Sequence, residues 1–367
     1  MRILYLTDRL SGRGGAGLHL LDVARRAARD ASVTIASGRG TAAIEGVRLA
    51  RVKGLGASVG EGSAGLSRLP GLLAEAEVVH VQNVMNPAAL RMIRDTGRAV
   101  VTVQDHRVFC PGPGKTLPDG RPCEASMSAG ACAGCFEDAD YMARTLALTA
   151  ARRDAMRGAR LVVLSTYMAK ELAAAGLPGA AVIPPWVPAG DGARPGEGFV
   201  VGGRLVSHKA PLDAAAAWRL AGAPERLSVA GAGGLSGALE GPGVRALGWL
   251  SRSALRGVLR DARALLFPGR WQEPFGILGV EALAEGTPVI AARVGGVPEW
   301  ASAGCLLVPP GDVASMADAI QRLQRDPELA LSLGRAGRAA VRDRYSEAPL
   351  WARLRAIYEA IAQASTE

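Results

Sequence analysis

The chain lacks several features that point to particular classes of protein. Aromatic residues make up only 4% of its 367 residues, and it has only 4 histidines. No apolar run approaches the roughly 18 residues of a membrane-spanning helix, so none is expected. The basic segments lack interleaved aromatic residues and no recognition motif is present, which argues against nucleic-acid binding. The first residues form a strand pattern rather than a signal peptide, so a cytoplasmic location is expected.

Positive charge is in excess and unevenly distributed. The first 186 residues contain 23 Lys and Arg against 16 Asp and Glu, and the remainder 20 against 18. Two arginine clusters on predicted helices could contact anionic headgroups, which favours peripheral contact with the inner face of a membrane. A solvated arginine-rich surface is the alternative. The clusters are Arg25-Arg26-Arg29 and Arg152-Arg153-Arg157-Arg160.

Strand and helix patterns alternate along the whole chain, which predicts an α/β protein with doubly wound parallel sheets. The length favours two domains. We expect an N-terminal domain over 1–186, a Pro- and Gly-rich linker over 187–198, a C-terminal domain over 199–348 and a final helix over 349–367. The expected strands cover 2–7, 32–36, 78–81, 99–103, 161–164, 199–203, 227–231, 264–267 and 289–292.

Two glutamates, Glu273 and Glu281, surround the start of a predicted helix. Glu273 lies on the loop that leaves a buried strand, and Glu281 lies in the helix that follows. Both carboxylates are therefore expected beyond the carboxyl ends of the strands, where open parallel sheets bind ligands. Carboxylates there accept pairs of hydroxyl hydrogen bonds, which a sugar or a ribose offers. A solvated helix start with an acid near its N-terminus is the alternative.

The loop after the first strand of each half suits a diphosphate. Gly14 and Gly15 precede a helix whose free amides can bind a phosphate. Their distance from the strand, and the lack of an acid after the second strand, argue against a dehydrogenase. Arg204 and Lys209, five residues apart, can flank a diphosphate and stabilise it as it leaves. A glycine-rich turn and surface charge are the respective alternatives.

Four of the five cysteines, Cys110, Cys123, Cys132 and Cys135, lie within 26 residues rich in Gly, Pro and Ser. A loop of this composition cannot pack a core, so a cross-link would stabilise it. In a cytosolic chain, a structural zinc ion with four thiolate ligands is favoured; an iron–sulfur cluster, disulfides and free thiols are alternatives. Such a zinc would have no open position for catalysis. Cys305 is expected in the core.

The stretch from Pro268 to Glu281, followed by Gly286–Ile290 and Gly295–Glu299, resembles the signature of family 4 glycosyltransferases. The resemblance implies a GT-B fold: two facing Rossmann-like domains with a C-terminal helix that crosses back to the first. It implies a retaining enzyme without a catalytic cofactor that transfers a sugar from a nucleoside-diphosphate sugar to a hydroxyl acceptor. Polysaccharide, lipopolysaccharide or glycolipid assembly is expected, with a lipid-linked acceptor favoured by the basic helices. The alternatives are a secondary-metabolite glycosyltransferase, an epimerase or hydrolase, and a non-catalytic sugar-nucleotide-binding protein.

The resemblance also implies residue roles. Glu273 would face the donor sugar, Glu281 would bind the ribose, and Arg204 and Lys209 would neutralise the diphosphate. The C-terminal domain would thus bind the donor and the N-terminal domain the acceptor. The remaining expected donor-binding positions are Gly14, Gly15, Gly231, Gly233, Phe275, Gly276 and Ile277.

One segment departs from the family pattern. Relatives carry His-Asp at the end of the strand over 99–103, whereas this chain has Gln104 and Asp105, with His106 next. A Gln can hydrogen-bond a hydroxyl but cannot be an acid or base near neutral pH. Gln104 and His106 are both candidates to line the site, and Asp105 is a candidate to hold the acceptor hydroxyl. Asp138-Ala139-Asp140 resembles the metal motif of the other large glycosyltransferase fold, but it follows the cysteine loop rather than a buried strand.

Overall fold

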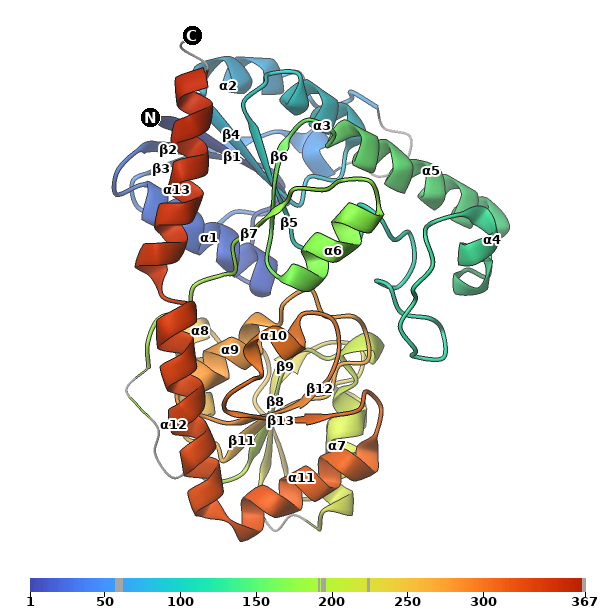
Figure 1. Cartoon of the computed structure of the whole chain (residues 1–367), viewed down its shortest axis with the longest axis vertical. Coiled ribbons are helices and arrows are strands. Elements are labelled where there is room, and N and C mark those ends of the chain that lie inside the picture. Colours follow the sequence, from blue (N-terminus) through green and yellow to red (C-terminus); the bar gives the residue numbers. More distant parts are fainter. Residues whose placement is uncertain (57–61, 191, 193–195, 223–224, 365–367) are drawn as a thin grey trace. The chain divides into compact units, whose positions relative to one another are not determined.

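The computed structural model describes residues 1–56, 62–190, 192, 196–222 and 225–364. The chain divides into two units, described separately below (Figure 1). Residues 191 and 193–195 of the predicted linker lie outside the described residues. The N-terminal unit comprises Met1–Leu117, Cys123–Pro184 and Ala348–Glu367, and the C-terminal unit comprises Pro118–Pro122 and Pro185–Glu347.

The N-terminal unit contains a seven-stranded sheet with the order β3-β2-β1-β4-β5-β6-β7, in which all neighbouring strands are parallel. The chain reverses its direction of winding between β1 and β4, and such sheets bind ligands beyond the strand ends at this point. The strands are β1 (Arg2–Arg9), β2 (Ser32–Arg39), β3 (Val47–Arg51), β4 (Val78–Gln82), β5 (Ala99–Val103), β6 (Arg160–Val163) and β7 (Ala181–Val182).

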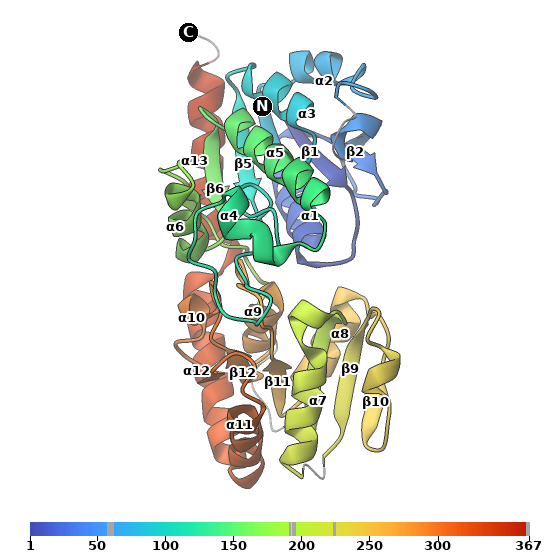
Figure 2. The same ribbon diagram turned by 90° about the vertical axis from the view of Figure 1, so that its right-hand side faces the viewer.

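Helices enclose this sheet (Figure 2). Alternate residues of the central strands, such as Leu4, Leu6 and Val79, pack in one core cluster with apolar side chains of α2, α3 and α6. Successive strand residues point to opposite faces, so Tyr5 and His80 lie on the other face. The helices are α1 (Gly15–Ala27), η1 (Lys53–Gly56), α2 (Leu69–Glu75), α3 (Pro87–Arg94), α4 (Ala129–Cys132), η2 (Ala133–Cys135), α5 (Ala139–Ala155), α6 (Thr166–Ala174) and α13 (Glu347–Ala364).

The last helix, α13, packs on this second face through a buried polar network. The hydroxyl of Tyr358 lies 3.1 Å from the Tyr5 hydroxyl and 2.5 Å from His80 Nδ1. His80 Nε2 in turn lies 2.7 Å from Thr102 Oγ1. Burial of the ring lowers the pKa of His80 to about 3. Helix α13 thus contacts β1 and β4 directly, and it is linked to β5 through His80.

The C-terminal unit contains a six-stranded parallel sheet with the order β10-β9-β8-β11-β12-β13. Its winding reverses between β8 and β11, as the first sheet's does between β1 and β4. The strands are β8 (Phe199–Arg204), β9 (Leu227–Ala232), β10 (Val244–Ala246), β11 (Ala264–Phe267), β12 (Val289–Ala292) and β13 (Cys305–Val308). The helices are η3 (Ser207–Lys209), α7 (Pro211–Leu220), η4 (Gly237–Leu239), α8 (Arg252–Arg260), α9 (Ile277–Ala284), α10 (Val297–Trp300), α11 (Val313–Arg325) and α12 (Pro327–Arg344).

The predicted α/β fold with two doubly wound parallel sheets is confirmed, and each predicted strand has a counterpart within a few residues. Four strands were not predicted: β3, β7, β10 and β13. All four are at sheet edges, and Val308 of β13 is the one buried residue among them. Strands β3, β7 and β10 lack the continuous apolar run by which buried parallel strands are recognised. Strand β13 is apolar, and of its residues only Cys305 was predicted, as part of the core.

Candidate functional site

Lys209 and Glu273 form an ion pair in the C-terminal unit, with Lys209 Nζ donating to Glu273 Oε2. Lys209 ends η3, which follows β8, and Glu273 lies on the loop between β11 and α9. Strands β8 and β11 are parallel neighbours, so their carboxyl ends bring the two loops together. The structure therefore places two of the predicted site residues in direct contact.

Trp271 and His208 complete this cluster, and sequence analysis identified neither. Trp271 Nε1 donates to Glu273 Oε2 over 2.9 Å, and Lys209 Nζ lies 4.7 Å from the centre of the indole ring. The His208 ring is 5.0 Å from the indole. Burial, followed by the charges of Lys209 and Arg204, lowers the pKa of His208 to about 4. Arg204, exposed at the end of β8, thus acts on the same cluster.

The loop that bears Glu273 is held by its own backbone. The Glu273 carbonyl accepts a hydrogen bond from the Gly296 amide at 2.8 Å, and a Cβ at Gly295 would come within 2.3 Å of that oxygen. Gly295 of the predicted signature is therefore needed for close approach. Trp300, which is fully buried, donates from Nε1 to the Phe275 carbonyl over 2.5 Å. These contacts fix the loop in front of α9.

The predicted backbone-binding positions lie at the start of α9. Gly276 has a φ of 92°, a left-handed conformation that favours glycine, and the helix begins at Ile277. No described side chain caps this helix start. Its first amides are consequently available to an acceptor atom of a ligand. The Phe275 side chain is buried and packs on Tyr345, so only the backbone of Phe275 is suited to binding.

Glu281 has a protein partner that the sequence did not indicate. Arg252 Nε, in α8, donates to Glu281 Oε1 over 2.6 Å, and only 6% of the Glu281 side chain is exposed. A ribose bound by this carboxylate would share it with Arg252.

Gly231 and Gly233 are accounted for by backbone packing between β8 and β9. A Cβ at Gly231 would lie 2.0 Å from the Gly203 carbonyl oxygen, and one at Gly233 would lie 2.3 Å from that of Leu205. A side chain at either position would displace the neighbouring strand end. Their predicted nucleotide contact remains a prediction.

In the N-terminal unit, Gly14 and Gly15 mark the beginning of α1. Gly14 has a φ of 83°, and the helix starts at Gly15 without a side-chain cap among the described residues. A Cβ at Gly14 would meet no atom within 4 Å, so the space beside it is open. This arrangement leaves first-turn amides for an anion.

The two candidates after β5 have different partners. His106 is buried, its Nε2 lies 3.0 Å from the Tyr167 hydroxyl, and its ring packs edge-on against Phe109. Gln104 donates from Nε2 to Gln82 Oε1 over 2.6 Å, and its own Oε1 has no partner among the described residues. A buried amide oxygen without a partner is costly, and a ligand hydroxyl could satisfy it.

Asp105 belongs to a charged cluster at the carboxyl ends of β1 and β5. Arg107 donates from Nε to Asp105 Oδ2 over 2.9 Å. Burial alone would raise the pKa of Asp105, but the charge and hydrogen bonds of Arg107 outweigh burial and lower it. Asp8, at the end of β1, has a raised pKa because burial outweighs the nearby Arg107. Sequence analysis missed Asp8, because a single Asp at a strand end carries no motif.

The four clustered cysteines lie around the loop that precedes α4 and in the α4–η2 segment. None of them forms a disulfide. Burial, followed by the other three thiols, raises the pKa of Cys135. Among the described residues, no three His, Cys, Asp or Glu side chains stand close enough together to hold a metal ion. The predicted zinc site therefore remains a prediction.

The arginine clusters are partly engaged within the N-terminal unit. Arg26 pairs with Asp30 at 2.7 Å and lies 4.9 Å above the Trp351 ring of α13. Arg152 is buried and donates to the Met85 carbonyl over 2.8 Å, so it cannot face a membrane. No described helix is both long and apolar enough to cross a bilayer.

Asp138 and Asp140 also have a structural explanation. Asp138 caps α5 by accepting a hydrogen bond from the Tyr141 amide at 2.6 Å, and Asp140 lies in the first turn. Acidic residues at a helix start are favourable without any metal.

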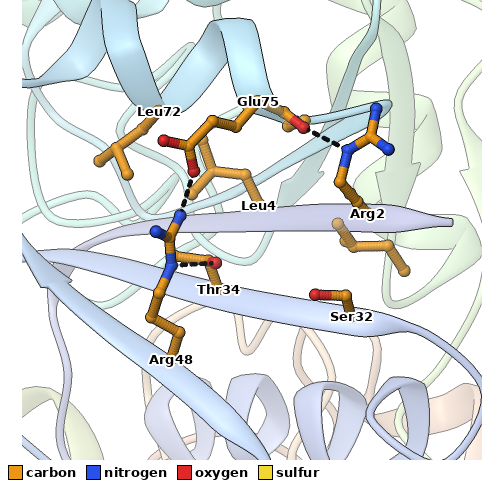
Figure 3. Close-up of a pocket in the computed structure, with 9 residues that line it drawn as sticks. Arg2, Leu4, Ser32, Thr34, Arg48, Leu72 and Glu75 are labelled. Atoms are coloured by element: carbon orange, nitrogen blue, oxygen red, sulfur yellow. Dashed lines mark hydrogen bonds and ion pairs between the residues drawn. The ribbon is translucent and has the colours of Figure 1, made fainter.

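A separate pocket of about 340 Å³ lies at the amino ends of β1 and β2 (Figure 3). Arg48 Nε donates to Thr34 Oγ1 over 3.0 Å and its guanidinium pairs with Glu75, whose carbonyl accepts from Arg2 Nε. None of the predicted site residues lines it. The pocket is at the opposite end of the strands from Gln104 and Asp105.

Solved glycosyltransferases share the fold of the whole chain. Sucrose-phosphate synthase from Thermosynechococcus elongatus superposes with a TM-score of 0.73 at 19% identity, covering 99% of each chain. WaaG, a glycosyltransferase involved in lipopolysaccharide biosynthesis, gives 0.71 at 15% identity over 97% of this chain and 99% of WaaG. The chain has the GT-B fold. The fold class expected from the sequence is thereby confirmed.

The family model that matches this chain lies within its C-terminal unit. Residues 197–326 match the family model described as "Glycosyl transferases group 1". Phosphatidyl-myo-inositol mannosyltransferase of Mycobacterium leprae is 33% identical over 126 residues, which are 34% of this chain and 33% of the relative. D-inositol 3-phosphate glycosyltransferase of Saccharomonospora viridis is 42% identical over 83 residues, 22% of this chain and 19% of the relative. The chain thus aligns with a third or less of the length of these relatives.

Proposed function

We propose that this protein is a retaining family 4 glycosyltransferase that transfers a sugar from a nucleoside-diphosphate sugar to a hydroxyl acceptor. The observation that carries the proposal is the Lys209–Glu273 pair with Arg204 beside it, at the carboxyl ends of β8 and β11. The pair lies within the segment that matches the glycosyltransferase family model. A sugar nucleotide fits this arrangement, because the Glu273 carboxylate can accept hydrogen bonds from sugar hydroxyls and Arg204 and Lys209 can bind the diphosphate.

The residues would act mainly by positioning and by charge. Arg204 and Lys209 would stabilise the diphosphate as the bond to the sugar breaks. An oxygen of the leaving diphosphate would take the proton of the acceptor hydroxyl, which attacks from the same face, so the anomeric configuration is kept. Glu273 and the amides at the start of α9 would orient the sugar. No residue of the chain needs to be a strong base, and no step needs a metal.

Glu281 would bind the ribose hydroxyls through one carboxylate oxygen, while Arg252 donates to the other, Oε1. The chain is also similar in fold to HepE from Anabaena, whose structure was solved in complex with UDP-glucose. The TM-score is 0.66 at 18% identity, over 100% of this chain and 99% of HepE. This similarity favours testing uridine nucleotides first. The identity of the base is left to the experiment.

The acceptor side is proposed from the N-terminal unit. Gln104, whose Oε1 has no hydrogen-bond partner among the described residues, is taken as a residue that lines the site, and His106, whose Nε2 contacts the Tyr167 hydroxyl, stays the other candidate. Asp105, kept ionised by Arg107, would accept a hydrogen bond from the acceptor hydroxyl. A lipid-linked or polysaccharide acceptor at the inner face of a membrane is proposed. Of the Arg25-Arg26-Arg29 cluster, Arg25 and Arg29 are exposed and could contact anionic headgroups.

A structural zinc ion at Cys110, Cys123, Cys132 and Cys135 is proposed as well. The support is the presence of four cysteines within 26 residues of one loop after His106, three of which act on the pKa of the fourth, Cys135. Because no ligating set is already assembled among the described residues, the thiols would have to draw together around the ion. Its role would be to order the loop beside the acceptor site.

Calorimetric titration with UDP, GDP and ADP tests the donor site. We expect one of the three to bind, with Glu281→Ala and Lys209→Ala each weakening binding at least tenfold and Arg121→Ala, an exposed residue of the cysteine loop, leaving it unchanged. Absence of binding by all three would contradict the proposal. Binding without turnover of any sugar nucleotide would favour the alternative, a non-catalytic sugar-nucleotide-binding protein. Retention is then checked by NMR of the glycosidic bond in the product.

A further inference from the structure

The indole of Trp271 contacts both charged residues of the proposed donor site. Its Nε1 donates to Glu273 Oε2 over 2.9 Å, and Lys209 Nζ lies 4.7 Å from the centre of the ring. The same oxygen, Oε2, also accepts from Lys209 Nζ. One carboxylate oxygen is therefore held by an ammonium and by an indole N–H, while the ammonium interacts with the ring face.

The backbone that carries the indole is fixed independently of Glu273. The His208 carbonyl accepts hydrogen bonds from the amides of Arg270 at 3.1 Å and Trp271 at 3.4 Å. Arg270 also forms two hydrogen bonds with the Asp213 carboxylate of α7, at 2.6 Å and 2.9 Å. The segment that carries the indole is thus joined to the loop that carries Lys209, so the ring can serve as a fixed point for both charges.

Lys209 has two proposed partners, which creates a need for such a fixed point. Its ammonium pairs with Glu273 in the structure, and it would turn to the diphosphate when a donor binds. Glu273 would then lose its cation at the moment when it must orient the sugar. The indole N–H is neutral and does not compete for the phosphate, so it can hold Oε2 throughout.

We propose that Trp271 is the positioning residue of the donor-sugar site: it keeps the Glu273 carboxylate in its sugar-binding orientation while Lys209 engages the diphosphate. This inference rests on the proposed function. It predicts that loss of the N–H reduces the rate of the chemical step more than the affinity for the donor, because Trp271 acts through Glu273 and touches no part of the nucleotide.

The variant Trp271→Phe removes the N–H and keeps an aromatic ring beside Lys209. Trp218→Phe is the matched control, because the buried Trp218 of the same unit donates its N–H to the Glu225 carbonyl over 3.0 Å and forms no hydrogen bond or ring contact with a proposed site residue in the described part of the chain. The donor is whichever of a panel of UDP-, GDP- and ADP-sugars the wild-type protein hydrolyses. We expect kcat for hydrolysis by Trp271→Phe to fall about tenfold with KM changed less than threefold. The control is expected to keep both constants, even if it lowers the melting temperature.

A second measurement detects the hydrogen bond between the Trp271 indole and Glu273 without an activity assay. In protein labelled with ¹⁵N-tryptophan, the indole N–H signal that is missing in Trp271→Phe should shift upfield in Glu273→Ala, and the signal of Trp218 should not. If Trp271→Phe hydrolyses the donor as fast as the control does, the positioning role is wrong while the proposed function stands. The same conclusion follows if the Trp271 indole signal has the same chemical shift in Glu273→Ala as in the wild type. If wild-type protein turns over no sugar nucleotide, the proposed function fails and this role fails with it, whatever the indole signal shows.

Discussion

Arg252 and Glu281 join α8 to α9 through a hydrogen-bonded ion pair of 2.6 Å. The pattern repeats one turn further along both helices, where Arg256 and Arg260 pair with Glu285, whose side chain is fully buried. Two carboxylates four residues apart, one in α9 and one at its C-cap, are thus neutralised by arginines spaced four residues apart on α8. This ladder fixes the orientation of the helix that presents Glu281 to the proposed ribose.

Replacing Arg252 by Ala should destabilise the protein by about 3 kcal/mol, because it leaves the buried Glu281 carboxylate without its cation. Urea-induced unfolding measures the loss. Arg355→Ala is the control, since its pair with Glu359 is half exposed on both sides and should contribute only a small fraction of that energy. If Arg252→Ala lowers the free energy of unfolding no more than the small amount expected of Arg355→Ala, the Arg252–Glu281 pair does not stabilise the protein as predicted.

Two helical glycines are expected to respond in opposite ways to replacement by Ala. At Gly279, in α9, an added Cβ would meet the Trp300 ring at 2.2 Å, whereas at Gly257, in α8, it would meet nothing within 4 Å. Gly279→Ala should therefore cost about 1–3 kcal/mol through overpacking. Gly257→Ala should stabilise by about 0.5–1 kcal/mol, because Ala is the better helix former.

Calorimetry of the two glycine variants gives the sign of each effect. Trp300 also holds the Phe275 carbonyl, so Gly279→Ala should additionally weaken nucleotide-sugar binding. A stabilising Gly279→Ala would contradict the packing of Trp300 against α9.

The buried His80 should make stability depend on pH in the acid range. Its pKa is about 3 in the folded protein, below the ordinary value of 6.5. As the pH falls below about 6.5, the unfolded chain binds a proton that the folded chain excludes, so the free energy of unfolding decreases. Full stability is therefore present above pH 6.5, and about 2–3 kcal/mol should be lost by pH 4.5 through this group.

The variant His80→Gln isolates the contribution of this histidine. Its unfolding free energy, measured in urea between pH 7 and pH 4.5, should fall less steeply than that of the wild type. The slopes of unfolding free energy against pH should differ between the two proteins by the amount expected for about one proton taken up on unfolding. Parallel curves would show that His80 is protonated in the folded protein, and that its contacts with Tyr358 and Thr102 are not those of a neutral ring.

Zinc should be present at about one ion per chain in protein purified under reducing conditions. The double variant Cys132→Ser/Cys135→Ser should lose the metal and lower the melting temperature. Cys305→Ser is the control, because Cys305 lies in β13, outside the cysteine cluster. Metal-free wild-type protein with four titratable thiols in that cluster would contradict the zinc proposal.

The sequence predicted the order of elements because buried parallel strands leave a continuous apolar signal. Residues 199–203 and 264–267 are of this kind, and β8 and β11 form there as neighbours. The short motifs were also informative where glycine conformation decides the backbone, as at Gly276 and Gly295. The edge strand β3 was not predicted, because Arg48 and Arg51 interrupt any such run.

Side-chain pairings between distant elements could not be predicted. Arg252 and Glu281 are 29 residues apart, and His80 and Tyr358 are 278 apart. Residue spacing places a side chain on a face of its own element, whereas its partner depends on how the elements pack. Trp271 had a weak local signal, being two residues before Glu273, but only the structure shows that its N–H reaches the carboxylate.

The most direct test of the central claim is turnover of a nucleotide-sugar panel, followed by mass spectrometry, with wild-type protein, Lys209→Ala and Arg355→Ala. Arg355 is exposed on α13, outside the proposed site. We predict that the wild type and Arg355→Ala consume one donor and release its nucleoside diphosphate, and that Lys209→Ala does so at least a hundredfold more slowly, because it lacks the cation that stabilises the leaving group. Consumption of no donor by the wild type, or equal rates for all three proteins, would contradict the assignment of this site to glycosyl transfer.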